Sequence, residues 1–290
     1  MLDEITIVLL LYEEKWETLY KCLKSIQNFK IIIVDNSNNA SRKKEIEKQF
    51  KIHKYFLNKK NVGFGAGNNI GIKNCDWKYV LILSSDCIIP EQTIFELKRS
   101  LEKYNNCFLT TPTFVDENGK VSQNASQFPE INPVKIPLDL DGDICCQSVL
   151  GAAMFCRTND LKKIGMFDEK FFIFYEDDDL CRRIGLEEKS KIQIKSVKAV
   201  HQHGQGKSVK NSLKRTFLIN HNMAYSELYY FFKINQHQEK YKKLRKKIPS
   251  YMFKTLICFF TLQINRSVYF ISKILAFYKF KRFIKKNDHN

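Results

Sequence analysis

The sequence predicts an α/β fold followed by a helical, basic C-terminal region. Over the first 113 residues, strand-length apolar runs alternate with segments of helical periodicity, and several of these runs end at polar loops. Basic residues concentrate in the last third of the chain. At 290 residues, the chain is long enough for one large domain, or for one domain and an appendage.

The predicted strands of the first half are continuous apolar runs, which are typical of strands buried on both faces of a sheet. They are Ile5–Leu11, Lys30–Asp35, 52–57, 79–83 and 108–111. Helical spacing of apolar residues predicts helices over 15–27 and 91–104, and a charged segment predicts a third over 41–50. Strands and helices that alternate in this way form parallel sheets with helices on both faces.

The second half is less regular. Three prolines and many polar residues over 114–143 predict a loop, or an excursion over the binding site. A strand is expected over 149–156, a short helix capped by Asn159 follows it, and a last strand runs over 192–200.

Two carboxylates lie just beyond predicted strands. Asp35 ends the second strand and Asp86 follows the fourth. Ligands of parallel α/β sheets bind beyond the carboxyl ends of the strands. Both carboxylates are therefore expected at the ligand edge.

The segment Asn61–Gly71 is rich in glycine and follows a strand. It does not fit the dinucleotide fingerprint, because the third glycine would fall on Asn68 or Ile70. Its glycines are consistent with a plain turn or with a loop that closely approaches a ligand.

Four consecutive acids, residues 176–179, interrupt an apolar stretch that begins at Phe171. Crowded carboxylates beside aromatic residues raise one another's pKa, which makes a general base or a metal site a reasonable interpretation. The alternative is the first turn of a helix, where acids cap free N–H groups and where Asp178 and Arg182 form an i,i+4 pair.

The net charge of +17 belongs to the end of the chain. Residues 207–290 contain 19 Lys and Arg against 3 Asp and Glu, which leaves 29 against 28 for residues 1–206. Nine scattered cysteines without a Cys-x-x-Cys motif indicate a reducing compartment. Because the first residues are acidic rather than typical of a signal peptide, we expect a cytoplasmic location.

Four segments together resemble the family 2 glycosyltransferases of the bacterial rhamnosyltransferase-like kind. They are Ile32-Ile33-Val34-Asp35-Asn36-Ser37, Asn61 through Gly71, Leu81-Ile82-Leu83-Ser84-Ser85-Asp86, and Gly165-Met166-Phe167-Asp168-Glu169 through Glu176-Asp177-Asp178-Asp179-Leu180-Cys181-Arg182-Arg183. The match covers residues 5–208 in order and spacing. The resemblance implies a GT-A fold, a Rossmann-like mixed sheet with flanking helices, over residues 1–210, and leaves 211–290 as a helical basic region.

The resemblance also implies an inverting transfer of sugar from a UDP-, dTDP- or GDP-sugar to a glycan or lipid-linked acceptor. Asp177 would be the general base that takes the proton of the acceptor hydroxyl. Glu176, Asp179 and Asp168 would orient that base or bind the acceptor. The residues expected at the donor are Asp35, Asn61, Gly63, Asn69, Ser85 and Asp86.

A divalent metal, Mn²⁺ or Mg²⁺, is part of the same expectation. Asp86 would supply a hard oxygen ligand and His201 a nitrogen, with His203 as the alternative. The sequence departs from the family's Asp-x-Asp motif, because Ser84 replaces the first aspartate. Tyr12-Glu13 likewise stands where the subgroup has Tyr-Asn.

The C-terminal region has six basic residues among the eight from Lys240 to Lys247, and one helix is predicted beyond Pro249. A basic amphipathic helix of this kind lies in an anionic membrane surface, here the cytoplasmic face of the inner membrane. Alternatively, its apolar face packs on the rest of the chain or on a second copy in a homo-oligomer. Nucleic acid is not expected as a partner, because the aromatic residues fall on the apolar side.

The leading hypothesis is a glycosyltransferase of bacterial surface polysaccharide or lipooligosaccharide biosynthesis. A non-catalytic nucleotide-sugar-binding or membrane-scaffold protein with the same fold is the alternative. Substitution of Asp177 separates the two, since only the enzyme loses an activity.

Overall fold

The computed structural model describes residues 2–122, 125–131, 142–202 and 213–287. The chain forms two compact units. The N-terminal unit comprises residues 1–169 and 176–208, and the C-terminal unit comprises Lys170–Tyr175 and Val209–Asn290. The short segment Lys170–Tyr175 groups with the C-terminal unit although it directly precedes the acidic run.

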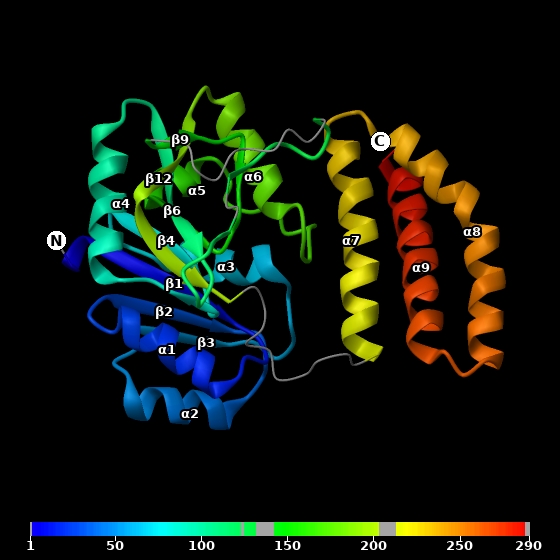
Figure 1. Ribbon diagram of the computed structural model, residues 1–290, viewed down its shortest axis with the longest axis horizontal. Helices are drawn as coiled ribbons and strands as arrows, with labels where there is room; N and C mark the ends of the chain where they lie inside the picture. The colour runs from blue at the N-terminus through cyan, green and yellow to red at the C-terminus, as the bar shows by residue number, and fades with distance from the viewer. Residues whose placement is uncertain (1, 123–124, 132–141, 203–212, 288–290) are drawn as a thin grey trace. The chain divides into compact units, whose positions relative to one another are not determined.

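A mixed sheet organises the N-terminal unit (Figure 1). Its strands follow the order β3 (Lys54–Leu57), β2 (Lys30–Asp35), β1 (Ile5–Leu11), β4 (Tyr79–Ser84), β11 (Ala153–Arg157), β6 (Cys107–Val115), β12 (Ser190–His201) and β5 (Cys87–Ile88). The first four are parallel, and β11 runs antiparallel to both β4 and β6. The sheet is therefore not all parallel, as periodicity alone had indicated, but mixed, as the GT-A resemblance implies.

Each central strand is buried on both faces, with alternate residues in two separate cores. In β1, Ile7 and Leu9 belong to one core and Val8 to the other. This period of two is the geometry of an extended strand. Helices α1 (Trp16–Ile26), α2 (Ala40–Gln49) and α4 (Glu91–Lys103) pack in the first core, and α3 (Phe64–Lys73), α5 (Thr158–Lys163) and α6 (Glu176–Leu186) pack in or beside the second.

The glycine-rich segment forms most of helix α3, which corrects the expectation of a turn or loop. Its glycines let the helix approach the sheet. A Cβ on Gly67 would overlap Leu10 Cδ1, and a Cβ on Gly71 would overlap Val8 Cγ1. Gly63, which precedes the helix, has φ 97°, a backbone conformation that favours glycine.

Local differences from the predicted elements cluster around residue 150. The strand expected over 149–156 is divided into β10 (Ser148–Val149) and β11, because the chain turns at Gly151. Helix α5 begins at Thr158, and Asn159 lies inside it rather than capping it. The remaining short elements are a 3₁₀ turn at Leu2–Glu4 and strands β7 (Val121–Ser122), β8 (Ala125–Ser126) and β9 (Ile144–Cys145).

The C-terminal unit contains helices α7 (Leu213–Lys233), α8 (His237–Phe260) and α9 (Ile264–Asn287), which pack side by side (Figure 1). Their core is aromatic and includes Tyr229, Phe280 and also Phe171 of the early segment. The single helix expected beyond Pro249 is wrong. Helix α8 continues through Pro249 and ends at Phe260, and a tight turn starts α9. Within the described residues, no helix has the length and apolar character needed to span a membrane.

Candidate active site

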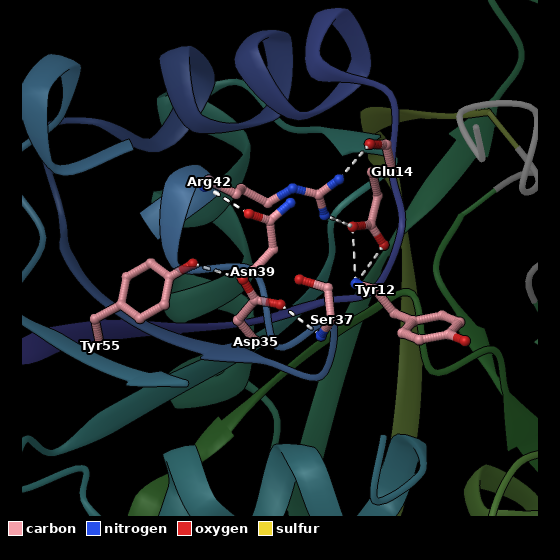
Figure 2. Close-up of polar contacts among 7 residues, drawn as sticks. All are labelled: Tyr12, Glu14, Asp35, Ser37, Asn39, Arg42 and Tyr55. Carbon is pink, nitrogen blue, oxygen red and sulfur yellow. Dashed lines mark hydrogen bonds and ion pairs between the residues drawn. The ribbon is translucent and has the colours of Figure 1, made fainter. Parts of the chain in front are cut away.

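Asp35 lies at the carboxyl end of β2, where both of its carboxylate oxygens are held (Figure 2). Oδ1 accepts a hydrogen bond from the Ser37 backbone N–H at 2.7 Å, and Oδ2 accepts one from the Tyr55 hydroxyl at 2.7 Å. Tyr55 pairs with Ile33 across β2 and β3, two residues before Asp35, so it points to the same face. The carboxylate is buried and has a fixed orientation.

Glu14 forms a second buried network beside Asp35 (Figure 2). Its two carboxylate oxygens accept from the Tyr12 N–H at 2.8 Å each, and Arg42 approaches one of them at 3.4 Å. The Arg42 guanidinium also donates to the Glu14 carbonyl at 2.9 Å. Burial raises the pKa of Glu14, whereas the hydrogen bonds from Tyr12 and Ser85 and the charge of Arg42 lower it.

Asp86 and His201 meet at the end of the sheet. The distance from Asp86 Oδ1 to His201 Nε2 is 3.4 Å. Their backbones are fixed by the pairing of His201 with Cys87 and by the hydrogen bond from the Gln202 N–H to the Asp86 carbonyl. We call Glu14, Asp35 and Asp86, with the residues that hold them, the β-edge site.

The asparagines of the glycine-rich segment stabilise the fold itself. Asn61 Oδ1 accepts from the Gly63 N–H at 2.9 Å, just before α3. Asn69 donates to the carbonyl of Phe167 and to Glu169, and it accepts from the Phe167 N–H. Since both ends of its buried side chain are engaged, Asn69 positions the segment that leads to the acidic run.

The four acids occupy the first turn of α6, as the capping alternative predicted. Asp177 Oδ2 accepts from the Gly151 N–H at 3.1 Å, and Oδ1 accepts from the Asp178 N–H at 3.0 Å. Burial raises the pKa of Asp177, and these backbone donors oppose that rise. Phe174 and Tyr175, directly before the helix, have φ angles of 74° and 68°, which is strained for residues other than glycine.

The neighbours of Asp177 differ in their contacts. Asp178 accepts from the Ser148 hydroxyl at 2.6 Å, yet burial and the charge of Asp177 raise its pKa to about 7. The same two causes raise the pKa of Glu176 well above its usual range. We call residues 176–179 and their donors the α6 site.

The i,i+4 ion pair of this helix is not the one expected. Arg183 Nε donates to Asp179 at 2.9 Å, and Arg182 pairs with Glu130. Arg183 also donates to the carbonyls of Ile164 and Met166, which fixes the end of the preceding turn. Asp179 is thus engaged in an ion pair within the fold.

A chain of contacts connects the two sites within the N-terminal unit. The Ser84 N–H donates to the Ala152 carbonyl at 2.8 Å, next to the Gly151 N–H that holds Asp177. A Cβ on Gly151 would lie 3.3 Å from the Phe64 ring and 3.7 Å from Asp177 Cβ. Asn36, next to Asp35, donates to the Gly63 carbonyl beside Phe64.

Three further residues were expected at the site: Ser85, Asp168 and His203. Ser85 is buried and bonded to Glu14. The backbone carbonyl of Asp168 lies 3.6 Å from a Cβ on Gly65, beside α3. His203, the alternative metal ligand, lies outside the described residues.

Residues 6–160 match the sequence model of the family described as "Glycosyl transferase family 2". This match covers more than half of the chain. The chain belongs to glycosyl transferase family 2. It is accordingly a glycosyltransferase by family, and the resemblance carried by its four motifs is confirmed.

Curated relatives agree with this membership. The chain is 27% identical over 214 residues to the low-salt glycan biosynthesis hexosyltransferase Agl10 of Haloferax volcanii, covering 69% of this chain and 68% of Agl10. It is 25% identical over 195 residues to the rhamnosyltransferase WbbL of Escherichia coli, and the match covers 60% of this chain and 72% of WbbL.

Solved structures of two other glycosyltransferases share the fold. GalNAc-T7, in a structure with UDP, GalNAc and Mn²⁺, superposes with a TM-score of 0.59 at 14% identity over 81% of this chain. TarS of S. aureus superposes with a TM-score of 0.52 at 16% identity over 76% of this chain. The chain spans about half of the first protein and 39% of the second. The family 2 member described here therefore has the GT-A fold.

Three parts of the site were missed by the analysis of the sequence. Nothing in the sequence distinguishes Glu14 from the neighbouring Glu13, although it is Glu14 that is buried. Arg42 is one of several cations on a charged helix, and nothing in its position distinguishes it. Tyr55 was recognisable only once β3 was aligned with β2, because the parallel register places it beside Asp35.

Asp86 and His201 are spaced as two ligands of one divalent metal ion would be. Two ligands at about 2.1 Å from one ion lie roughly 3 Å apart, close to the separation of Asp86 Oδ1 and His201 Nε2. Among the described residues, no cluster of three His, Cys, Asp or Glu side chains is suited to hold a metal. Mg²⁺ and related ions keep open positions for water and substrate phosphates, so a two-residue site is compatible with them.

Proposed function

We propose that this protein is an inverting glycosyltransferase that moves a sugar from a nucleotide-sugar donor to a hydroxyl of a glycan or lipid-linked acceptor. The proposal is supported chiefly by Asp177, a carboxylate with a raised pKa that two backbone N–H groups hold near the β-edge site. A general base needs both a fixed direction and a pKa closer to neutrality than that of a free aspartate. Asp177 meets both requirements.

In the proposed reaction, the acceptor oxygen forms a bond with the anomeric carbon while the bond from that carbon to the diphosphate breaks. Asp177 takes the proton of the acceptor hydroxyl, which must lie within about 3 Å of the carboxylate. Attack from the face opposite the leaving group inverts the anomeric centre. The nucleoside diphosphate departs with the bonding electrons.

The β-edge site is proposed to bind the donor. Asp35 would contact the nucleotide base, and the Glu14 and Arg42 network would hold the segment after β1 in place. Asp86 and His201 would bind Mn²⁺ or Mg²⁺, which supplies positive charge to the departing diphosphate when it is bound. Ser85, Asn61 and Gly63 would shape the donor pocket through the contacts they make with Glu14 and α3.

We further propose a role in bacterial surface polysaccharide or lipooligosaccharide biosynthesis, in the cytoplasm, at the inner face of the membrane. The relatives Agl10 and WbbL, a glycan biosynthesis hexosyltransferase and a rhamnosyltransferase, support this assignment. The net positive charge of residues 207–290 is suited to an anionic lipid surface.

The test is a panel of UDP-, dTDP- and GDP-sugars, assayed for binding by thermal shift and for slow donor hydrolysis, each with and without Mn²⁺ or Mg²⁺. One nucleotide is expected to raise the melting temperature, more strongly with metal, and its sugar is expected to be hydrolysed. A protein that binds and hydrolyses none of these donors would not be the proposed enzyme.

A further inference from the structure

Helices α8 and α9 are joined by a tight turn at one end of the hairpin that they form (Figure 1). A group of large apolar side chains is exposed at and near this turn. We call this group the hairpin tip. It consists of Met252, Phe253, Leu256, Ile257, Phe259, Phe260, Leu262 and Ile264. Phe260 is 80% exposed and Leu262 82%. Single exposed apolar residues are ordinary on protein surfaces, but a contiguous group of this kind marks an interaction site.

The backbone of the turn makes the exposure of Leu262 more informative. The Gln263 N–H donates to the Cys258 carbonyl and the Leu262 N–H to the Phe259 carbonyl, which is the Schellman pattern of a helix end. Leu262 occupies the left-handed position of that pattern, with φ 57°, where glycine is usual. A leucine here strains the backbone and gains little packing within the chain, so its side chain is available to an outside partner.

The charges around the hairpin tip select the partner. Of the 14 Lys and Arg of residues 240–287, Lys254 and Arg266 are the two nearest in sequence to the turn, and this range contains no Asp or Glu. Lys254 lies between one and two helical turns before the end of α8. Arg266 is the third residue of α9. The rings of Tyr251 and Tyr269 contact Phe270, and the Lys254 ammonium lies 5.8 Å from the centre of the same ring. Apolar residues bordered by cations and tyrosines are the composition of a membrane-interface anchor.

Distances along the helix agree with shallow insertion. Phe260 lies six positions after Lys254 along α8, which corresponds to about 9 Å at 1.5 Å per residue. Interfacial segments bury their apolar groups about 5–10 Å deep. Lys254, with Met252 and Phe253 before it, would therefore lie at the level of the headgroups, and the residues from Leu256 to Ile264 would lie deeper. Because α8 and α9 are antiparallel, the Lys240–Lys247 cluster lies at the opposite end of the hairpin from the tip.

We infer that the hairpin tip inserts end-on into the interface of a bilayer that contains anionic lipids, and so anchors the enzyme to the surface that carries its acceptor. This inference deepens the proposed function. The binding of the hairpin tip to a bilayer does not depend on that function, but the reason for the binding, access to a membrane acceptor, does. It replaces the in-plane amphipathic helix that the sequence predicted, because the most exposed apolar side chains of the hairpin, such as Phe260 and Leu262, lie at its turn.

The test is flotation of the full-length protein with vesicles of phosphatidylcholine alone or with 30% phosphatidylglycerol. The unmodified protein is expected to float with the anionic vesicles at low salt and less at high salt. The combined substitution of Phe253→Ser, Phe260→Ser and Leu262→Gly is expected to weaken binding at least tenfold. Leu186→Ser, which replaces a 75% exposed leucine on α6, is the matched control and should bind normally.

Leu262→Gly alone provides a second check, because it relieves the backbone strain. It is expected to raise the melting temperature while it lowers vesicle binding, so weaker binding cannot be attributed to unfolding. Donor hydrolysis without vesicles should be unchanged in every variant. If the unmodified protein hydrolyses no donor but still binds the vesicles, the proposed function is contradicted and the membrane anchor is not.

Two results would overturn the anchor. One is failure of the unmodified protein to float with anionic vesicles at low salt, or equal flotation of the triple variant. The other is a dimer in solution that the triple variant converts to a monomer with vesicle binding unchanged, which would make the hairpin tip a contact between two copies of the chain.

Discussion

Backbone N–H groups hold the buried carboxylates at both sites, but at the β-edge site a side chain is added to each, Arg42 on Glu14 and Tyr55 on Asp35. At the α6 site, the hydrogen bonds to Asp177 come from the backbone N–H groups of Gly151 and Asp178. Burial raises the pKa of Glu14 as well as that of Asp177, but at Glu14 the full positive charge of Arg42 opposes the rise and favours the ionised form. Backbone donors and a helix N-terminus supply only partial charges. The first arrangement suits residues that bind and position, and the second suits a group that must accept and release a proton.

The largest effect is expected where the comparison is sharpest, at Asp177. Asp177→Asn removes the proposed base while its side-chain oxygen still accepts from Gly151, so transfer should fall by about 10³-fold. Donor binding should change by less than about threefold, because the β-edge site is unaltered. Steady-state transfer and isothermal titration with the donor nucleotide measure the two quantities.

Asp76→Asn is the control for that substitution, since Asp76 is exposed and pairs with Lys54. A variant at Asp177 that keeps normal transfer would assign the base elsewhere. Equal loss of transfer and of nucleotide binding would indicate that the two sites are not separate in function.

Asp178 tests the electrostatic half of the comparison. Its pKa is raised to about 7 from a usual 3.8, so the contribution of Asp178 to stability is complete below pH 3.8 and is lost as pH rises through 7. Asp178→Asn keeps an oxygen that can accept from the Ser148 hydroxyl. Because asparagine does not ionise, the variant does not lose stability at this position as pH rises. The variant should therefore be more stable than the unmodified protein at pH 8, by about 2 kcal/mol after allowance for partial exposure, and less so at pH 5.

Urea denaturation at pH 5 and pH 8 measures this difference. The same substitution at exposed Asp76 should show little dependence on pH. A stability difference for Asp178→Asn that is equal at the two pH values would mean that the carboxylate is ionised throughout.

Arg42 tests the other side of the comparison. Arg42→Gln leaves the buried Glu14 carboxylate without its cation, which should cost about 1–3 kcal/mol of stability. Because Tyr12 is held by Glu14, donor affinity should fall by about five- to tenfold with little change in kcat. Lys44→Gln, on the exposed side of the same helix, is the control.

The double variant Glu14→Gln with Arg42→Gln separates charge from packing. Neutralising both partners should recover much of the stability that Arg42→Gln loses, as measured by thermal unfolding. If the double variant is less stable than either single variant, the pair contributes through contacts other than charge.

The smallest effect is expected at Tyr55. Tyr55→Phe removes one hydrogen bond to Asp35 and should cost about 1 kcal/mol of stability and about threefold in donor affinity. Tyr104→Phe removes a comparable hydrogen bond to Asp143 at an exposed position and should affect neither by as much. Unchanged donor binding in Tyr55→Phe would place the nucleotide away from Asp35.

Much of the N-terminal unit could be predicted because its strands carry a strong local signal. Continuous apolar runs identified β1, β2 and β4, and the first turn of α6 was identified by its acids. The errors arose where distant packing decides the outcome. The glycines of α3 are explained by Leu10 and Val8 on another element, and the strand break at Gly151 by the α6 site.

By itself, the sequence determined which residue types could do chemistry and in what order they occur: Asp35, Asp86 and Asp177 after strands or at a helix start. Only the tertiary structure decided their surroundings, such as Tyr55 on Asp35, Arg42 on Glu14 and the backbone of Gly151 on Asp177. It also decided that the most exposed apolar residues of the C-terminal region lie at the turn between α8 and α9. Local pattern records hydropathy and spacing, whereas burial and partnership depend on segments far apart in the chain.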